Sequence, residues 1–242
     1  MSARSQQNPW LHRFAMFTAL ATLFLIGMGG LVTSKGVGMA VPDWPNTFGY
    51  NMFLVPLDRW IGQYGIFEEH AHRLLASFVG LLTSILAVWL LAKESRLWVR
   101  RIGVVAFVLV VVQGILGGLR VTEINSNLGL IHGTVAQLFL IVICGIALFT
   151  SAWWERVTLT REQGVCFAEL KGLIVTVICL LFVQLLLGAT MRHQHAGLAI
   201  WDFPLAHGQL WPSTNSSSVA DYNKNRLELQ NQLFVQDQLL NE

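Results

Sequence analysis

Long apolar runs separated by short polar segments dominate the chain, a pattern typical of helices that cross a membrane. The runs cover about residues 14–32, 74–92, 102–119, 128–151 and 173–189. Each is close to the ~20 residues that a helix needs to cross the hydrocarbon core of a bilayer. We therefore predict an all-α, polytopic membrane helix bundle of about five transmembrane helices, with an N-terminal four-helix half followed by the start of a second repeat.

The polar segments between the runs set the predicted domain boundaries. We expect a cytoplasmic N-terminus at 1–13, a four-helix half at 14–151, the start of a second half at 152–212 and a polar tail at 213–242. The segment 152–212 contains one span and one outer loop.

Composition and charge support this class. Of the 242 residues, 54% are hydrophobic and only 12% are charged, against about 25% in soluble domains. The net charge of +2 is too small to indicate a nucleic-acid partner. Basic residues cluster on the side of the membrane that holds the N-terminus, which the positive-inside rule predicts to be the cytoplasm. They are Arg4, Arg13, Lys93, Arg96, Arg100, Arg101, Arg156, Arg161 and Lys171.

Ionisable residues stand at the head of the second apolar run, in the stretch from Glu68 to Arg73. Ionisable groups at membrane depth are costly and usually face a protein interior, a cavity or a bound group. Glu69 and His72 are three residues apart, so they share one face of a helix. A carboxylate beside an imidazole can move protons or hold a metal cofactor.

His72 stands near the outer end of the second span and His132 near the start of the fourth, so each is expected a few residues into its helix. Both helices are predicted to run inward from the outer side, so the two imidazoles lie at similar depth. Such a pair is suited to axial ligation of a haem. The alternative for each is a histidine that only hydrogen-bonds a neighbouring helix. His70 faces another way, and His193, His195 and His207 are expected to be solvated loop residues.

Two loops carry the same pattern, Gly-x-Ala-x-x-Asp-aromatic-Pro, at 38–45 and 197–204. This loop match predicts an internal repeat with a period near 159 residues. Residues 113–118 also match 184–189, as Gln-x-x-x-Gly followed by a small residue. The outer loop from Lys35 to Phe67 contains prolines that exclude a regular helix. It is either an interfacial loop or a cover over an outer site. Small residues should allow close helix approach at Gly27, Gly29, Gly30, Gly114, Gly117 and Gly118.

Taken in order, these motifs resemble the haem A synthase family over residues 14–212. The motifs are Gly29-Gly30-Leu31-Val32-Thr33-Ser34, Pro42-Asp43-Trp44-Pro45, Glu69-x-x-His72-Arg73, Gln113-Gly114-x-Leu116-Gly117-Gly118, His132-x-x-x-Ala136-Gln137 and Gln184-x-x-x-Gly188-Ala189. The resemblance implies an iron- and haem-binding oxidoreductase of haem A biosynthesis. It would oxidise the C8 methyl of haem O to a formyl group, giving haem A for cytochrome oxidase assembly.

The resemblance also implies roles for individual residues. His72 and His132 would ligate haem O as substrate, and Glu69 would be the catalytic carboxylate beside the reacting methyl. Candidates for propionate or substrate contact are Arg73, Arg120, Gln113 and Gln137. Snorkelling to the headgroups is the alternative for the arginines. The bacterial cytoplasmic membrane is the implied location, and haem O synthase is an implied partner.

The sequence departs from the family pattern in two ways. The first outer loop lacks the cysteine pair that many bacterial members carry. The spans that would hold the ligand pair of haem b in the second half are also missing from this chain. We therefore expect a fragment, or a half that is completed by another chain in a homo-oligomer or by a separate second half.

Two other classes of function fit the sequence less well. A di-histidine electron-transfer module without catalysis would have no need of Glu69 one turn from its ligand. A small-molecule transporter fits an internal repeat but calls for polar residues near mid-bilayer, whereas here they cluster at the outer edge.

Overall fold

The computed structural model describes residues 8–157, 160–194, 196, 200 and 202–224. Its helices are α1 (Pro9–Ser34), α2 (Ile66–Lys93), α3 (Leu97–Thr122), α4 (Ser126–Phe149), α5 (Ala152–Arg156), α6 (Arg161–His193) and α7 (Ser216–Lys224), with a short 3-10 helix, η1, at Leu57–Arg59. Five of them, α1 to α4 and α6, are long and apolar enough to cross a membrane. The predicted all-α fold with five spans is confirmed.

The helices begin and end beyond the apolar runs because polar residues cap them. Asn8 precedes Pro9 and accepts hydrogen bonds from the backbone N–H groups of Trp10 and Leu11 at 3.1 and 3.2 Å. This is a favourable N-cap with proline in the first helical turn. Glu68 closes the start of α2, because its Oε2 accepts from the backbone N–H of Gly65 at 2.8 Å. The second span therefore begins at Ile66, eight residues before the apolar run.

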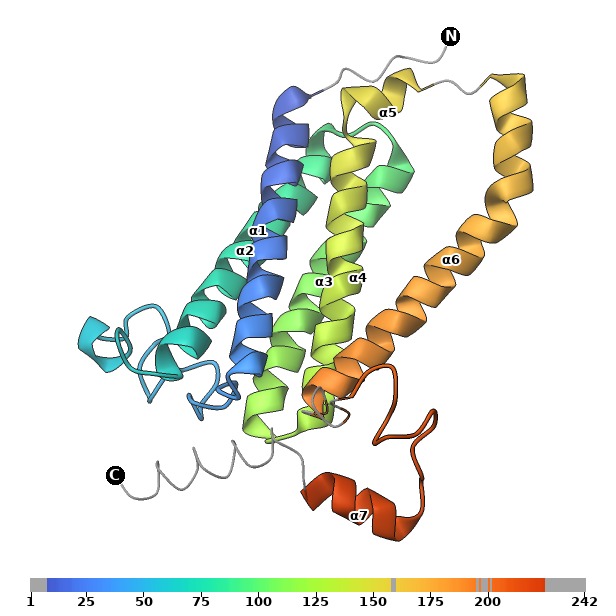
Figure 1. Cartoon of the computed structure of the whole chain (residues 1–242). Coiled ribbons are helices and arrows are strands. Elements are labelled where there is room, and N and C mark those ends of the chain that lie inside the picture. Colours follow the sequence, from blue (N-terminus) through green and yellow to red (C-terminus); the bar gives the residue numbers. More distant parts are fainter. Residues whose placement is uncertain (1–7, 158–159, 195, 197–199, 201, 225–242) are drawn as a thin grey trace. The chain divides into compact units, whose positions relative to one another are not determined.

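Helices α1 to α4 pack as a ring in which each helix touches the next and α4 returns to α1 (Figure 1). Neighbouring helices are antiparallel: α1 and α2 are joined by the long loop 35–65, and short connections join α2 to α3 and α3 to α4. The helices α2 and α4 therefore run in the same direction on opposite corners of the ring. We call the end at which α1 and α3 finish and α2 and α4 begin the loop end of the bundle.

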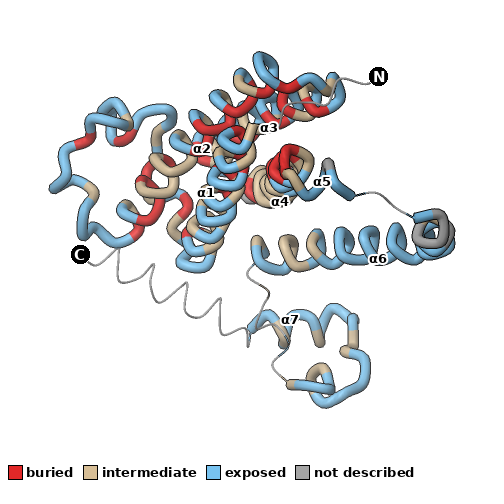
Figure 2. The backbone as a smooth tube through the Cα atoms, turned by 90° about the horizontal axis from the view of Figure 1, so that it is seen from above, coloured by how far each residue is buried: buried red, intermediate tan, exposed pale blue. Residues whose placement is uncertain are grey.

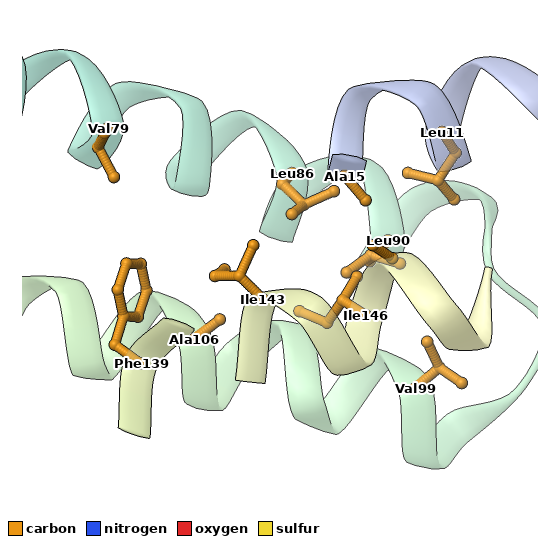
Figure 3. Packing of buried hydrophobic residues seen from close by; sticks show 11 residues of the cluster. Leu11, Ala15, Val79, Leu86, Leu90, Val99, Ala106, Phe139, Ile143 and Ile146 are labelled. Atoms are coloured by element: carbon orange, nitrogen blue, oxygen red, sulfur yellow. The ribbon is translucent and has the colours of Figure 1, made fainter. Parts of the chain in front are cut away.

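The packed apolar core lies in the half of the bundle away from the loop end (Figure 3). Its members are Leu11, Ala15, Val79, Leu86, Leu90, Val99, Ala106, Phe139, Ile143, Ile146 and Ala147. Hydroxyl groups inside the bundle are satisfied within their own helices: Thr18, Thr22 and Thr83 each donate to the carbonyl four residues earlier. This removes the cost of a polar group where water is absent. Residues on the outer faces of the helices are exposed (Figure 2). Many of them are large and apolar, as expected for lipid-facing positions.

The loop between α1 and α2 has no regular helix apart from η1, as its prolines predict. It nevertheless has an interior, in which Val41, Thr47 and Val55 are buried. Asp43 holds the turn that follows it: Oδ1 accepts from the N–H of Phe48 and Oδ2 from the N–H of Gly49, both at 2.8 Å.

Contacts group the chain into two units, Met1–Leu185 and Leu186–Glu242. In the second unit Asp202 accepts from the N–H groups of His207 at 2.8 Å and Gly208 at 2.7 Å. The offsets of five and six residues equal those at Asp43. Each turn also closes with a β-bridge, Thr47 to Tyr50 and Ala206 to Gln209. The predicted loop repeat is therefore confirmed from each aspartate onward, whereas residues 197–199 and 201 lie outside the described part.

One expectation for the end of the chain needs correction: His193 belongs to the last turn of α6 and not to a loop. Within the predicted polar tail, residues 216–224 form helix α7, which has no apolar run to reveal it. His207 does lie in a loop, where it stacks on Tyr222 of α7 with ring centroids 3.7 Å apart. His195 and residues 225–242 lie outside the described residues.

Candidate active site

The two histidines lie at the same level near the loop end of the bundle. His72 follows the first residue of α2 by six positions, and His132 follows the first residue of α4 by six. At 1.5 Å per residue each stands roughly 9 Å into its helix. Because α2 and α4 run in parallel on opposite corners, the imidazoles sit on opposite sides of the same layer. The matched depth predicted from the sequence agrees with these bounds.

A glycine of the neighbouring helix lies against each imidazole. Gly29 is five residues before the end of α1, and a Cβ there would stand 3.0 Å from Cε1 of His72. Gly117 is five residues before the end of α3, and its Cβ would stand 3.3 Å from Cε1 of His132. These glycines were expected to bring helices together, but their neighbour is an imidazole. The recurring Gly-Gly-Leu at 29–31 and 117–119 was a sequence signal for this relation.

The histidine layer is polar. Nδ1 of His72 is buried and has no hydrogen-bond partner among the described residues, and Nδ1 of His132 is buried too. Leaving a buried polar atom unsatisfied costs about 1–3 kcal/mol, which a ligand on that nitrogen would remove.

Two imidazole donors are suited to a metal ion that is already bound by another ligand. Within the described residues no group of three or more His, Cys, Asp or Glu side chains is placed to hold a metal ion. Two imidazoles on opposite helices fit axial ligation of a haem, because the porphyrin supplies the other four nitrogens. The core cluster also stops short of this layer: its members nearest the histidines on α2 and α4 are Val79 and Phe139, each seven residues away.

Glu69 and Arg73 fasten the α1–α2 loop to α2. Nη2 of Arg73 donates to Oε1 of Glu69 at 2.6 Å and to the carbonyl of Val41 at 2.8 Å. Nη1 donates to the carbonyls of Asp43 at 2.6 Å and Asn46 at 3.1 Å. All four terminal N–H bonds of Arg73 are therefore engaged. Oε2 of Glu69 accepts from the N–H of Val41 at 2.9 Å, and both side chains are buried.

The same loop touches the end of α3. A Cβ on Gly118 would collide with the indole of Trp44, so the ring lies directly on the α3 backbone. A Cβ on Gly38 would collide with the guanidinium of Arg120. Glycine is needed at 118 to permit the approach of the rigid indole, whereas at 38 the end of the flexible Arg120 side chain would have to shift. These contacts come from the tertiary course of the loop, and no local motif indicates them.

Three polar side chains at the α1–α2 loop, Lys35, Asp43 and His70, have defined partners. Lys35 donates to Oε1 of Glu68, and this hydrogen bond raises the pKa of Lys35 although desolvation opposes it. Burial alone would raise the pKa of Asp43, but the N–H donors of Gly49 and Phe48 and the charge of Arg73 outweigh it and lower that pKa. His70 contacts Thr47 at 3.3 Å, with the ring of Trp60 at its edge, so it faces the loop and not the histidine layer.

The glutamine candidates differ in their surroundings. Gln113 on α3 is buried, and its Nε2 has no hydrogen-bond partner within the part of the chain that the structure describes. Gln137 is half-buried on α4, five residues beyond His132.

Fold and site together define a multi-pass membrane protein with a paired-imidazole site. The chain belongs to the COX15-CtaA family of cytochrome oxidase assembly proteins, whose model matches residues 12–236. This confirms the family assignment predicted from the motifs.

Curated relatives named heme A synthase match most of the chain. The protein from Shouchella clausii is 28% identical over 214 residues, covering 86% of this chain and 68% of the relative. The protein from Halalkalibacterium halodurans is 27% identical over 203 residues, covering 82% of this chain and 65% of the relative. The chain thus spans about two thirds of the length of these relatives. The matches support an oxidoreductase role and give no support to an electron-transfer module. No solved structure matches the chain significantly.

Proposed function

We propose that this chain is the substrate-binding part of a haem A synthase, which oxidises the C8 methyl of haem O to a formyl group and so gives haem A for cytochrome oxidase assembly. The observation that carries the proposal is the pair His72 and His132, six residues into two parallel helices, with Gly29 and Gly117 against their rings. The two imidazoles would hold the haem iron, and the iron with its electron acceptor would supply the oxidation.

Proton removal is the part of this reaction that falls to the protein. Converting a methyl group and water into a formyl group releases four protons and four electrons. Glu69 lies one turn before His72, and its charge acts on Arg120. Each carboxylate oxygen accepts one described hydrogen bond and can accept a second, so Glu69 retains acceptor capacity toward the layer. We assign it the role of taking a proton from water or from the oxidised methyl carbon.

The setting of the reaction is part of the same proposal. The bundle would lie in the bacterial cytoplasmic membrane with its N-terminus inside and the loop end outside, as the basic residues predict. Haem b and its ligand pair would come from a further part of the protein or from a partner copy. Haem O synthase would deliver the substrate.

The test is the haem content and optical spectrum of the purified full chain beside His72→Ala, His132→Ala and Glu69→Gln, with His207→Ala as the matched control. We expect bound haem O with a low-spin di-histidine spectrum in the wild type and in the control. Either active-site histidine variant should lose it, whereas Glu69→Gln should keep the haem but yield no oxidised product. Haem retention in both histidine variants at wild-type levels would overturn the proposal.

A further inference from the structure

One line of residues on α3 changes from apolar to polar on reaching the histidine layer. Val99, Ala106, Gln113 and Arg120 are spaced by seven residues, or about two helical turns, so they follow one face of the helix. Val99 and Ala106 belong to the buried core cluster, which fixes this face as the inward one. Gln113 and Arg120 continue the line where the core cluster no longer reaches.

Gln113 places an amide donor inside the bundle. The side chain is 9% exposed, and its Nε2 has no partner within the described ranges. A buried N–H without an acceptor is costly, whereas an apolar side chain of similar length would have cost nothing here. The position is therefore suited to a ligand that brings an oxygen atom to this depth.

Arg120 places a cation on the opposite side of the histidine layer. Its Nε is buried without a hydrogen-bond partner in the described chain, and its guanidinium lies against Gly38. Arg73 has all four terminal N–H bonds engaged by the loop and Glu69. Of these two arginines, Arg120 is therefore the one with a buried donor left for an anionic group.

The spacing on α3 matches the two edges of a flat ligand in this layer. Gly117 lies against His132 and marks its level. Gln113 is four residues deeper, roughly 6 Å along the axis, and Arg120 is three residues toward the loop end, roughly 4.5 Å. A haem centred between the histidines would thus present one edge to each.

We propose that Arg120 binds the propionate carboxylates at the outer edge of the haem, and that Gln113 donates a hydrogen bond to the side-chain hydroxyl by which haem O differs from haem B. The inference rests on the proposed function and extends it, because Gln113 becomes the residue that selects the substrate. Haem B carries a vinyl group in place of the hydroxylated farnesyl side chain and leaves the amide unpaired. A site built to hydrogen-bond a hydroxyl disfavours the analogue that lacks it.

The test measures the affinity of the full chain for haem O, haem B and the dimethyl ester of haem B. Gln113→Met keeps the length of the side chain and removes the donor. It should lower the haem O to haem B affinity ratio about five- to tenfold with little change for haem B. Without haem, Gln113→Met should be at least as stable as the wild type, whereas a purely structural role predicts that it is less stable. Gln184→Met is the matched control, because Gln184 stands in the similar Gln-x-x-x-Gly-Ala motif of α6 and is exposed.

The outer edge is tested with Arg120→Gln, which should weaken binding of haem B about tenfold and leave its dimethyl ester unaffected. Arg120→Lys should recover part of the loss because it restores the charge. An unchanged affinity ratio in Gln113→Met, or equal loss of haem B and its ester in Arg120→Gln, would overturn the inference. His72→Ala and His132→Ala distinguish failure of this inference from failure of the proposed function. If these two variants bind haem as the wild type does, the proposed function itself fails.

Discussion

The two Asp-aromatic-Pro loops share a turn but differ in what holds them. At Asp43 and at Asp202 the carboxylate receives the same two backbone hydrogen bonds, five and six residues on. In the first unit, however, Arg73 of the following helix also binds three loop carbonyls. In the second unit the described support from a following helix is the stack of His207 on Tyr222. The comparison teaches that the turn is local, whereas its attachment depends on a partner helix.

Exposure follows the same division. Val41 and Thr47 of the first loop are fully buried, whereas Phe203 of the second is 98% exposed within the chain. Among the described loop residues, those of the first loop therefore pack into the interior of their unit, whereas Phe203 of the second loop does not.

The largest effect is expected from Arg73→Ala. The change leaves the buried Glu69 carboxylate unpaired and three loop carbonyls without their donor, so we expect a loss of about 3–5 kcal/mol in the free energy of unfolding. Thermal unfolding of the detergent-solubilised chain measures it. Arg59→Ala, at an exposed position of η1, is the control; equal stability of the two variants would show that the first loop is not anchored in this way.

A smaller effect is expected from the aromatic residue that follows each aspartate. Trp44→Ala removes the indole from the α3 backbone at Gly118 and should cost about 1–3 kcal/mol. Phe203→Ala should change stability by less than about 0.5 kcal/mol, because its side chain has no burial to lose within the chain. Trypsin cleavage after Arg59 reports loosening of the first loop. If both variants behave alike, the difference between the loops is not one of packing.

The smallest effect is a dependence on acid. The pKa of Asp43 and the pKa of Asp202 are both lowered by the hydrogen bonds that each carboxylate accepts from backbone N–H groups. A carboxyl with a lowered folded-state pKa stabilises the fold above its unfolded value, 3.8, and loses that contribution as the pH falls toward the folded value. Asp43→Asn should therefore be less stable at pH 6 and lose less on acidification.

Asp202→Asn should show the same sign in the second unit, read out by amide hydrogen exchange at the N–H groups of His207 and Gly208 that bind Asp202. A wild-type loop equally protected at pH 6 and pH 3 would contradict the role of these carboxylates.

Helix number and the level of the histidines could be predicted from the sequence because both depend on local spacing. Apolar runs near twenty residues identify spans, and the positions of His72 and His132 near the outer ends of their spans give an approximate depth. The equal depth follows from the helix starts, because each histidine lies six residues after the first residue of its helix. Helix ends were less predictable: α2 starts at Ile66 because Glu68 caps it, and α7 forms without an apolar run.

The contacts that shape the site depend on tertiary structure. Arg73 was expected as a propionate candidate, and the loop carbonyls that it binds are residues 27 to 32 positions away. Neither the hydrogen bonds from Arg73 to these carbonyls nor the approach of Trp44 to Gly118 is indicated by a local sequence motif. The propionate role of Arg73 stays a prediction, and its engaged N–H bonds favour Arg120 for it.

The equal placement of glycine and histidine makes α1–α2 and α3–α4 two versions of one hairpin, related by an approximate twofold arrangement about the histidine layer. One residue breaks that symmetry: three positions before His72 stands Glu69, and three positions before His132 stands Gly129. A flat, nearly symmetric ligand between the two hairpins therefore meets an acidic flank on one side and bare backbone on the other. The histidine layer is therefore chemically asymmetric, so turning such a ligand over would bring a different edge to the carboxylate.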